Sequence, residues 1–193
     1  MAETLADIGS RLDQLERELA EMRDMAAIQD VLTRYSRALD WLDDEMLDGV
    51  FFDDAEIDYG FFQGTGAAFK PLLMQVERSV GRRWHFTSQL KIDLNGTSAE
   101  VESYNLSLGI AALEDNPPSD VMQFFGMYAD RLEKRGGQWG IIRRKHLLVA
   151  GVSAKEITMT GEFGQLNKLG ATGVTHQDYR RLAELVSLPG VPA

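Results

Sequence analysis

The stretch Leu90-Lys91-Ile92-Asp93-Leu94-Asn95-Gly96 decides the fold class of this chain of 193 residues. Apolar and charged residues alternate along it, which is the period of a strand with one buried face. The Asn-Gly pair at its end favours a two-residue hairpin turn, so we expect residues 99–110 to return as the paired strand. Two more strands, over 121–132 and 138–147, are expected around a second hairpin at Arg135-Gly136-Gly137. The second half of the chain therefore predicts a long antiparallel meander.

Helical periodicity dominates the first half of the chain. Apolar residues recur at spacings of three and four over residues 3–24 and again over 26–39. Shorter helices are expected over 43–51 and 67–80, with one short strand between them at 56–59. Because helices come first and an antiparallel meander follows, the order predicts an α+β fold with helices on one face of a curved sheet.

The helix predicted over residues 3–24 carries an apolar seam with heptad spacing. The seam is too short to dimerise strongly alone, so it packs either on its own domain or on another subunit. We expect a homodimer or homotrimer with the seam in the contact, because an exposed apolar strip is a liability on a monomer. The seam consists of Leu5, Ile8, Leu12, Leu15, Leu19 and Met22.

We divide the chain into an N-terminal helical extension over 1–24, one domain over 25–152 and a C-terminal extension over 153–193. The periodic pattern weakens from about residue 153 onward. Within the last part, Thr175-x-x-Asp178 has the spacing of a capping box, which predicts a final helix through Val186.

Composition excludes several classes of protein. The 20 basic and 30 acidic residues give a net charge of −10, which argues against a nucleic-acid partner. No cysteine occurs, so disulfides, thiolate nucleophiles and cysteine metal sites are excluded. No apolar run approaches the roughly 20 residues of a membrane span, and the first residues do not read as a signal peptide. We therefore expect a cytoplasmic protein without a membrane partner.

Histidine is the usual general base near neutral pH, and the chain has three, at 85, 146 and 176. His85 is the best candidate because it lies between two apolar residues, Trp84 and Phe86. Asp40 ends an amphipathic helix beside Leu39, where an unpaired carboxylate would be costly. A dyad of Asp40 and His85 would fix the imidazole tautomer and stabilise the imidazolium. The alternatives are a core histidine without chemistry and a carboxylate that faces water.

Two tyrosines are the next candidates. Tyr35 precedes Asp40 on the same helix, and Tyr59 lies on the inward side of its predicted strand. A phenol can donate a hydrogen bond to a substrate oxygen that develops charge, although each tyrosine could equally be a core aromatic. The sequence has no paired histidines with metal-ligand spacing, no dinucleotide or phosphate loop, and no nucleophile elbow. We therefore expect no metal and no organic cofactor.

Several short motifs, taken in order, resemble one family. They extend over about residues 24–150 and resemble the SnoaL-like branch of the nuclear transport factor 2-like (NTF2-like) superfamily. That branch includes scytalone dehydratase, bile acid 7α-dehydratase and hexachlorocyclohexane dehydrochlorinase. The resemblance implies a cone-shaped curved sheet with helices on its concave face. The motifs are Ala27-Ile28-Gln29-Asp30 through Leu39-Asp40, the run 51–59, Trp84-His85-Phe86, Asn95-Gly96, and the run 137–144.

The same resemblance implies roles for individual residues. Asp40 and His85 match the family's catalytic dyad. Tyr35 matches a tyrosine five residues before the Asp in the bile acid enzyme, and Tyr59 matches one in an Ile-Asp-Tyr strand of scytalone dehydratase. Arg144 matches an arginine of the dehydrochlorinase, five residues after the hairpin Trp. A second catalytic His of scytalone dehydratase has no counterpart, because the stretch here reads Tyr104-Asn105-Leu106-Ser107.

The function expected from these residues is that of a cofactor-independent lyase. His85 would take a proton or assist the loss of hydroxide, while Tyr35, Tyr59 and Asn105 would hold substrate oxygens. Abundant aromatic residues suit a hydroxylated aromatic or polycyclic substrate. The family accommodates loss of water, loss of hydrogen halide and double-bond shifts. A related reaction is C–C cleavage, such as loss of formaldehyde from a lignin-derived dimer. The alternatives are an isomerase and a non-catalytic binding or structural subunit. The aromatic residues expected at the pocket are Trp41, Phe62, Trp84, Phe86 and Phe124.

Overall fold

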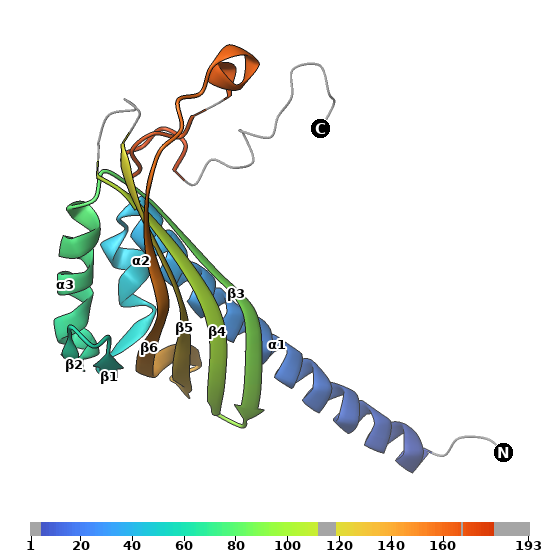
Figure 1. Cartoon of the computed structure of the whole chain (residues 1–193). Helices are drawn as coiled ribbons and strands as arrows, with labels where there is room; N and C mark the ends of the chain where they lie inside the picture. The colour runs from blue at the N-terminus through green and yellow to red at the C-terminus, as the bar shows by residue number, and fades with distance from the viewer. Residues whose placement is uncertain (1–4, 112–118, 167, 180–193) are drawn as a thin grey trace.

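Six strands form one curved sheet in the computed structural model, which describes residues 5–111, 119–166 and 168–179 (Figure 1). The strand order is β2-β1-β6-β5-β4-β3, so β3 is an edge strand. Neighbouring strands pair antiparallel, except that β1 runs parallel to β6. The bounds are β1 Phe51–Asp58, β2 Gln63–Thr65, β3 Arg82–Asn95, β4 Ser98–Ile110, β5 Asp120–Arg135 and β6 Gln138–Lys155.

Both predicted hairpins are confirmed. Asn95 pairs with Ser98 around the first turn, and Arg135 pairs with Gln138 around the second. Gly136 and Gly137 have φ of 58° and 86°, a region that glycine enters without steric cost. Alternate residues of β4 from Ala99 to Asn105 are buried, as the strand period requires. The predicted meander is therefore present, although β5 and β6 are longer than the sequence suggested.

The helices predicted over 3–24 and 26–39 are one continuous helix, α1, from Leu5 to Trp41. Neither Gly nor Pro interrupts residues 22–28, so nothing in the local sequence ends the helix there. The core-facing side of α1 begins only at Ile28. The preceding part projects away from the sheet (Figure 1), and Leu12 and Leu15 of its seam are each 55% exposed. The described part of the chain thus leaves the seam largely exposed.

Two shorter helices complete the layer. α2 spans Asp44–Asp48 and ends before residue 51, where β1 begins, so it is shorter than expected. α3 spans Gly66–Arg78. In the described part of the chain, no helix is both long and apolar enough to cross a membrane. The core fills the space between α1, α3 and the inner face of the sheet; its fully buried side chains include Ile28, Leu32, Leu39, Phe69, Leu132 and Ile141.

The C-terminal extension begins within β6, and its described residues after Lys155 form no further strand. It forms the short 3-10 helix η1, Gly161–Gln165, and then turns over residues 174–179. Residues 175–179 therefore do not start the predicted helix, and its remainder, 180–186, lies outside the described residues. The division of the chain at residues 24 and 152 stays a prediction.

Candidate active site

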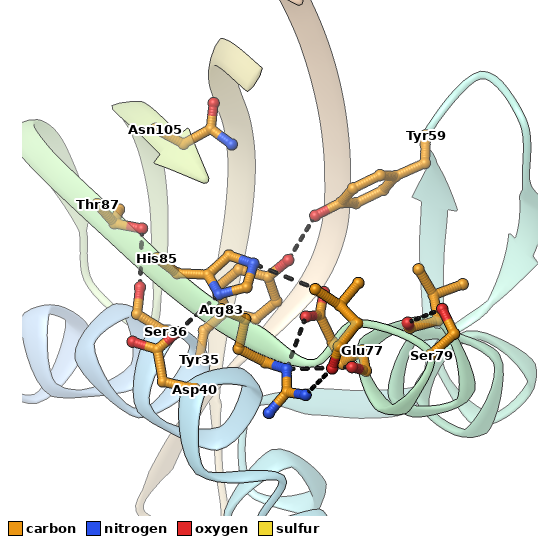
Figure 2. A network of polar contacts seen from close by, with 12 residues as sticks. Tyr35, Ser36, Asp40, Tyr59, Glu77, Ser79, Arg83, His85, Thr87 and Asn105 are labelled. Carbon is orange, nitrogen blue, oxygen red and sulfur yellow. Dashed lines mark hydrogen bonds and ion pairs between the residues drawn. The ribbon is translucent and has the colours of Figure 1, made fainter. Parts of the chain in front are cut away.

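Asp40 and His85 form the hydrogen-bonded pair that the sequence predicted. Asp40 lies in the last turn of α1, and His85 lies near the start of β3. Nδ1 of His85 is 2.8 Å from Oδ1 of Asp40, and the two side chains are only 10% and 18% exposed (Figure 2). Such a contact fixes which ring nitrogen carries the proton toward the carboxylate. The pair is therefore oriented for acid–base chemistry at the opposite nitrogen, Nε2.

A second carboxylate, which the sequence analysis missed, faces that opposite nitrogen. Oε1 of Glu77 lies 3.5 Å from Nε2 of His85, and Oε2 lies 3.8 Å from Nε of Arg83. Arg83 also donates hydrogen bonds to the backbone carbonyl groups of Glu77, at 3.0 Å, and of Val80. A signal existed in the sequence: Glu77 follows Phe69 and Leu73 at spacings of four, so it continues the buried face of α3.

The charges around His85 determine its protonation. Burial alone would lower the pKa of His85, but the carboxylates of Asp40 and Glu77 outweigh that effect and raise the pKa to about 9. Burial raises the pKa of Asp40, and the hydrogen bond from His85 opposes that rise. Burial also lowers the pKa of Arg83, with its two acidic neighbours opposing the effect. The two carboxylates that face the ring thus favour its charged form.

An open cleft of about 430 Å³ between α1 and β3 gives access to the pair. Ser36 and Thr87 lie at its wall, and their hydroxyl groups are 3.1 Å apart. Asp40, His85 and Phe86 also line it, together with Gln29, Leu32, Thr33, Arg37 and Leu90.

Three tyrosines form a hydroxyl cluster deeper in the fold. The hydroxyl groups of Tyr35 and Tyr59 are 2.6 Å apart, and the Tyr35 side chain is buried. Asn105 donates through Nδ2 to the hydroxyl of Tyr128 at 2.8 Å, while its Oδ1 has no partner among the described residues. Figure 2 shows the hydroxyl group of Tyr59 pointing toward that of Tyr35. Burial raises the pKa of Tyr35 and of Tyr59, so both phenols are neutral donors.

Arg144 lies beneath this cluster rather than in the cleft. It is fully buried, and its Cζ is 4.3 Å from the ring centroid of Tyr35 and 4.1 Å from that of Tyr128. Asp130 accepts two of its hydrogen bonds, at 2.8 and 2.6 Å. Among the described residues no atom pairs with its Nη1. The rings of Tyr35 and Tyr128 cover the Arg144 side chain, and Arg144 does not line the cleft. Its placement therefore gives no evidence for a contact with substrate.

The five aromatic residues expected around the pocket are not gathered there. Phe124 pairs with Ser107, which pairs with His85, so the three share one face of the sheet, but Phe124 does not line the cleft. Trp84 and Phe86 alternate with His85 along β3 and stack on each other, with ring centroids 5.6 Å apart. Phe86 still reaches the wall of the cleft.

Phe62 and Trp41 have other neighbours. Phe62 packs on Phe69, at 5.2 Å between ring centroids. Trp41 packs against His176 and Tyr179 of the C-terminal extension, at 5.6 and 5.5 Å. Strand alternation could have separated Trp84 from His85, but the position of the extension on Trp41 has no signal in the local sequence.

The C-terminal extension reaches the end of α1 directly beside the dyad. Thr172 donates a hydrogen bond to the backbone carbonyl of Asp40, and Tyr179 donates one to the carboxylate of Asp43. Nη1 of Arg83 lies 3.4 Å from the hydroxyl of Thr172. The segment 172–179 therefore holds the backbone of Asp40 in place from outside the sheet and its helices.

The described residues contain no group of three or more His, Asp or Glu side chains that could hold a metal ion. That no metal or cofactor takes part remains a prediction, which activity measurements must test.

The fold and the placement of the dyad define a domain of the NTF2-like superfamily. A SnoaL-like domain matches residues 20–145, and the chain belongs to that family. Among solved structures, a provisionally named scytalone dehydratase of Novosphingobium aromaticivorans is 25% identical, with a TM-score of 0.60; the match covers 83% of this chain and 97% of that one. A hexachlorocyclohexane dehydrochlorinase of Novosphingobium barchaimii is 18% identical, with a TM-score of 0.63; the match covers 75% of this chain and 99% of that one. The second likeness shows the fold alone. Among curated proteins none matches the chain.

Proposed function

We propose that this protein is a cofactor-independent lyase that eliminates water from a hydroxylated aromatic or polycyclic small molecule. The observation that carries the proposal is the 2.8 Å hydrogen bond between His85 and Asp40, in a largely buried position that an open cleft reaches. Membership of the SnoaL-like family and the likeness to a scytalone dehydratase support a lyase or isomerase more than a structural subunit.

The roles follow from what each group can do. His85 exchanges the proton of the reaction, and Asp40 orients its ring and stabilises its charge. The hydroxyl groups of Tyr35 and Tyr59, paired at 2.6 Å, hold a substrate oxygen and stabilise charge as it develops there. Asn105 supports the tyrosine cluster by donating a hydrogen bond to the hydroxyl of Tyr128.

An aromatic substrate suits this set of residues because a phenol or enone can itself delocalise the charge that develops during the reaction. Phe124, on the same face of the sheet as His85, would pack against such a ring. The same groups would also serve when a carbon fragment leaves, as in loss of formaldehyde from a lignin-derived dimer. A para-phenol that first loses its benzylic hydroxyl group as water becomes a quinone methide, which then accepts the electron pair of the breaking C–C bond.

Two measurements on the full chain test this function. In a thermal-shift screen, phenolic diols and polycyclic alcohols should raise the unfolding temperature, whereas aliphatic and sugar-like alcohols should not. Compounds that bind are then assayed for formation of a conjugated product by ultraviolet absorption.

His85→Gln and Asp40→Asn should each lower kcat/KM by at least about 10²-fold, the low end for loss of a general acid–base group. Glu18→Gln, an exposed carboxylate-to-amide change on α1, is the matched control and should leave the rate unchanged. An unchanged rate in the His85 variant would refute the dyad. Stabilisation by aliphatic compounds alone would refute the substrate class, and binding without turnover would favour a non-catalytic binding protein.

A further inference from the structure

Both ring nitrogens of His85 face carboxylate oxygens. Asp40 from α1 is 2.8 Å from Nδ1, and Glu77 from α3 is 3.5 Å from Nε2 (Figure 2). A neutral imidazole has one N–H group and one lone pair, so it would turn its lone pair toward one of these oxygens. Only the imidazolium offers an N–H group to each, and the geometry therefore favours the cation.

The balance of charge around His85 leads to the same form. Asp40 and Glu77 carry two negative charges, and Arg83 supplies one positive charge on the same side of β3. Arg37 lines the outer cleft, and the strand across from His85 contributes Ser107, which carries no charge. Glu77 and Arg83 are each 8% exposed, so water compensates them poorly. A charged His85 neutralises the cluster of four, whereas a neutral one leaves an excess buried anion.

We propose that Glu77 is a positioning residue, which holds His85 as a cation from the Nε2 side, so that the resting site donates a proton rather than accepts one. This inference rests on the proposed lyase function and specifies the first step of the reaction. Asp40 alone would orient the ring and leave its charge to the pH of the solution. With Glu77 on the other nitrogen, His85 would already be protonated before the substrate binds.

A single histidine can then both supply and recover the proton that the elimination needs. Nε2–H of His85 protonates the leaving hydroxyl group, the C–O bond breaks with its electron pair, and water leaves. The carbocation that remains is delocalised into the substrate's aromatic ring. The neutral Nε2 next takes a proton from the adjacent carbon, the electrons of that C–H bond form the C=C bond, and His85 is an imidazolium again.

The direct test is ¹⁵N NMR titration of the imidazole rings in the full chain, which is tractable because there are only three histidines. The His85 signals are assigned by comparison with His85→Gln. In the natural sequence, we expect His85 to stay cationic at pH 7 and to titrate near pH 9. In Glu77→Gln, which keeps the shape and removes the charge, the midpoint should fall by about one to three pH units. Glu77→Asp should restore part of that fall.

His146, on β6, is the internal control, and its signals should be the same in all the variants. A neutral His85 at pH 7 in the unaltered chain would overturn the proposal, and this holds even if Glu77→Gln fails to fold. An unchanged His85 midpoint in a folded Glu77→Gln would also overturn it, because Glu77 would then serve only as a partner of Arg83.

Activity separates this inference from the proposed function. With a turned-over substrate, kcat/KM should decline on the alkaline side of the natural protein, and that decline should move to lower pH in Glu77→Gln by the same amount as the NMR midpoint. If the NMR midpoint of His85 moves but the alkaline decline in kcat/KM does not, proton donation by His85 is refuted. A protein that turns over none of the compounds refutes the lyase, while the titration alone still decides the role of Glu77.

Discussion

The guanidinium of Arg144 and the carboxylate of Asp130 meet in two hydrogen bonds of 2.8 and 2.6 Å, and neither side chain is exposed to solvent. Asp130 raises the pKa of Arg144 against the opposing effect of burial, so the arginine stays charged. The rings of Tyr35 and Tyr128 cover the cation. This ion pair therefore packs directly against the tyrosine cluster and helps to position it.

Breaking that pair should therefore destabilise the fold. Asp130→Asn leaves a buried guanidinium without its counter-charge, and we expect the free energy of unfolding to fall by about 3–5 kcal/mol. The double variant Asp130→Leu with Arg144→Met removes both charges and should lose less than the single variant. Urea unfolding followed by circular dichroism measures both. A single variant within about 1 kcal/mol of the natural protein would contradict the prediction.

The charge on His85 should make stability depend on pH. Its folded-state pKa of about 9 lies above the ordinary value of 6.5, so the folded protein binds this proton more tightly than the unfolded chain does. The stabilisation is then complete below pH 6.5 and is lost as the pH rises through 9. We expect a loss of about 3 kcal/mol across that window, from urea unfolding at pH 6.5 and 9.5. His85→Gln should show a smaller slope, and equal slopes would disprove the assignment.

The exposed seam of α1 should hold subunits together. Light scattering should give a dimer or trimer for the full chain, because Leu12, Leu15 and Leu19 are 46–55% exposed in the single chain. Changing these three residues to Gln keeps the helix and removes the apolar contact, so the mass should fall to that of a monomer. Glu16→Gln with Glu18→Gln is the control on the charged faces. A monomeric full chain would refute the prediction. An unchanged oligomer in the Gln variant would place the subunit contact on the sheet instead.

Activity should survive removal of metals and small molecules. Once a substrate is found, prolonged dialysis with a chelator should leave kcat/KM unchanged, because the proposed steps use protein side chains alone. The control is a known metalloenzyme treated in parallel, which must lose activity. Activity that disappears and returns on addition of a metal ion or a flavin would show that a cofactor takes part.

Much of the fold could be predicted because its determinants are local. Asn95-Gly96 and Gly136-Gly137 fix the two hairpins, and alternation fixes which side of each strand is buried. The break expected after residue 24 was wrong, because a change from an exposed to a buried face does not end a helix. A strong helix breaker such as Pro would have ended it, and none occurs at residues 22–28.

The site could be predicted only in part because it joins distant segments. The Asp40–His85 contact followed from a resemblance, and the geometry agrees. Glu77 was missed although its spacing from Leu73 places it on the buried face of α3. No local pattern reports that Thr172 would bond to the backbone of Asp40, since 132 residues separate them.

The continuity of α1 has a consequence for how this protein can vary. The helix is 37 residues long, about 55 Å, and carries the apolar seam at one end and Asp40 at the other. Inserting one residue between Met22 and Ile28 would rotate the seam by about 100° around the helix axis relative to Asp40. Whatever the seam contacts would then meet the polar side of the helix. Length changes in this region should therefore be tolerated mainly in whole turns, which preserve the angle between the seam and Asp40 around the helix axis.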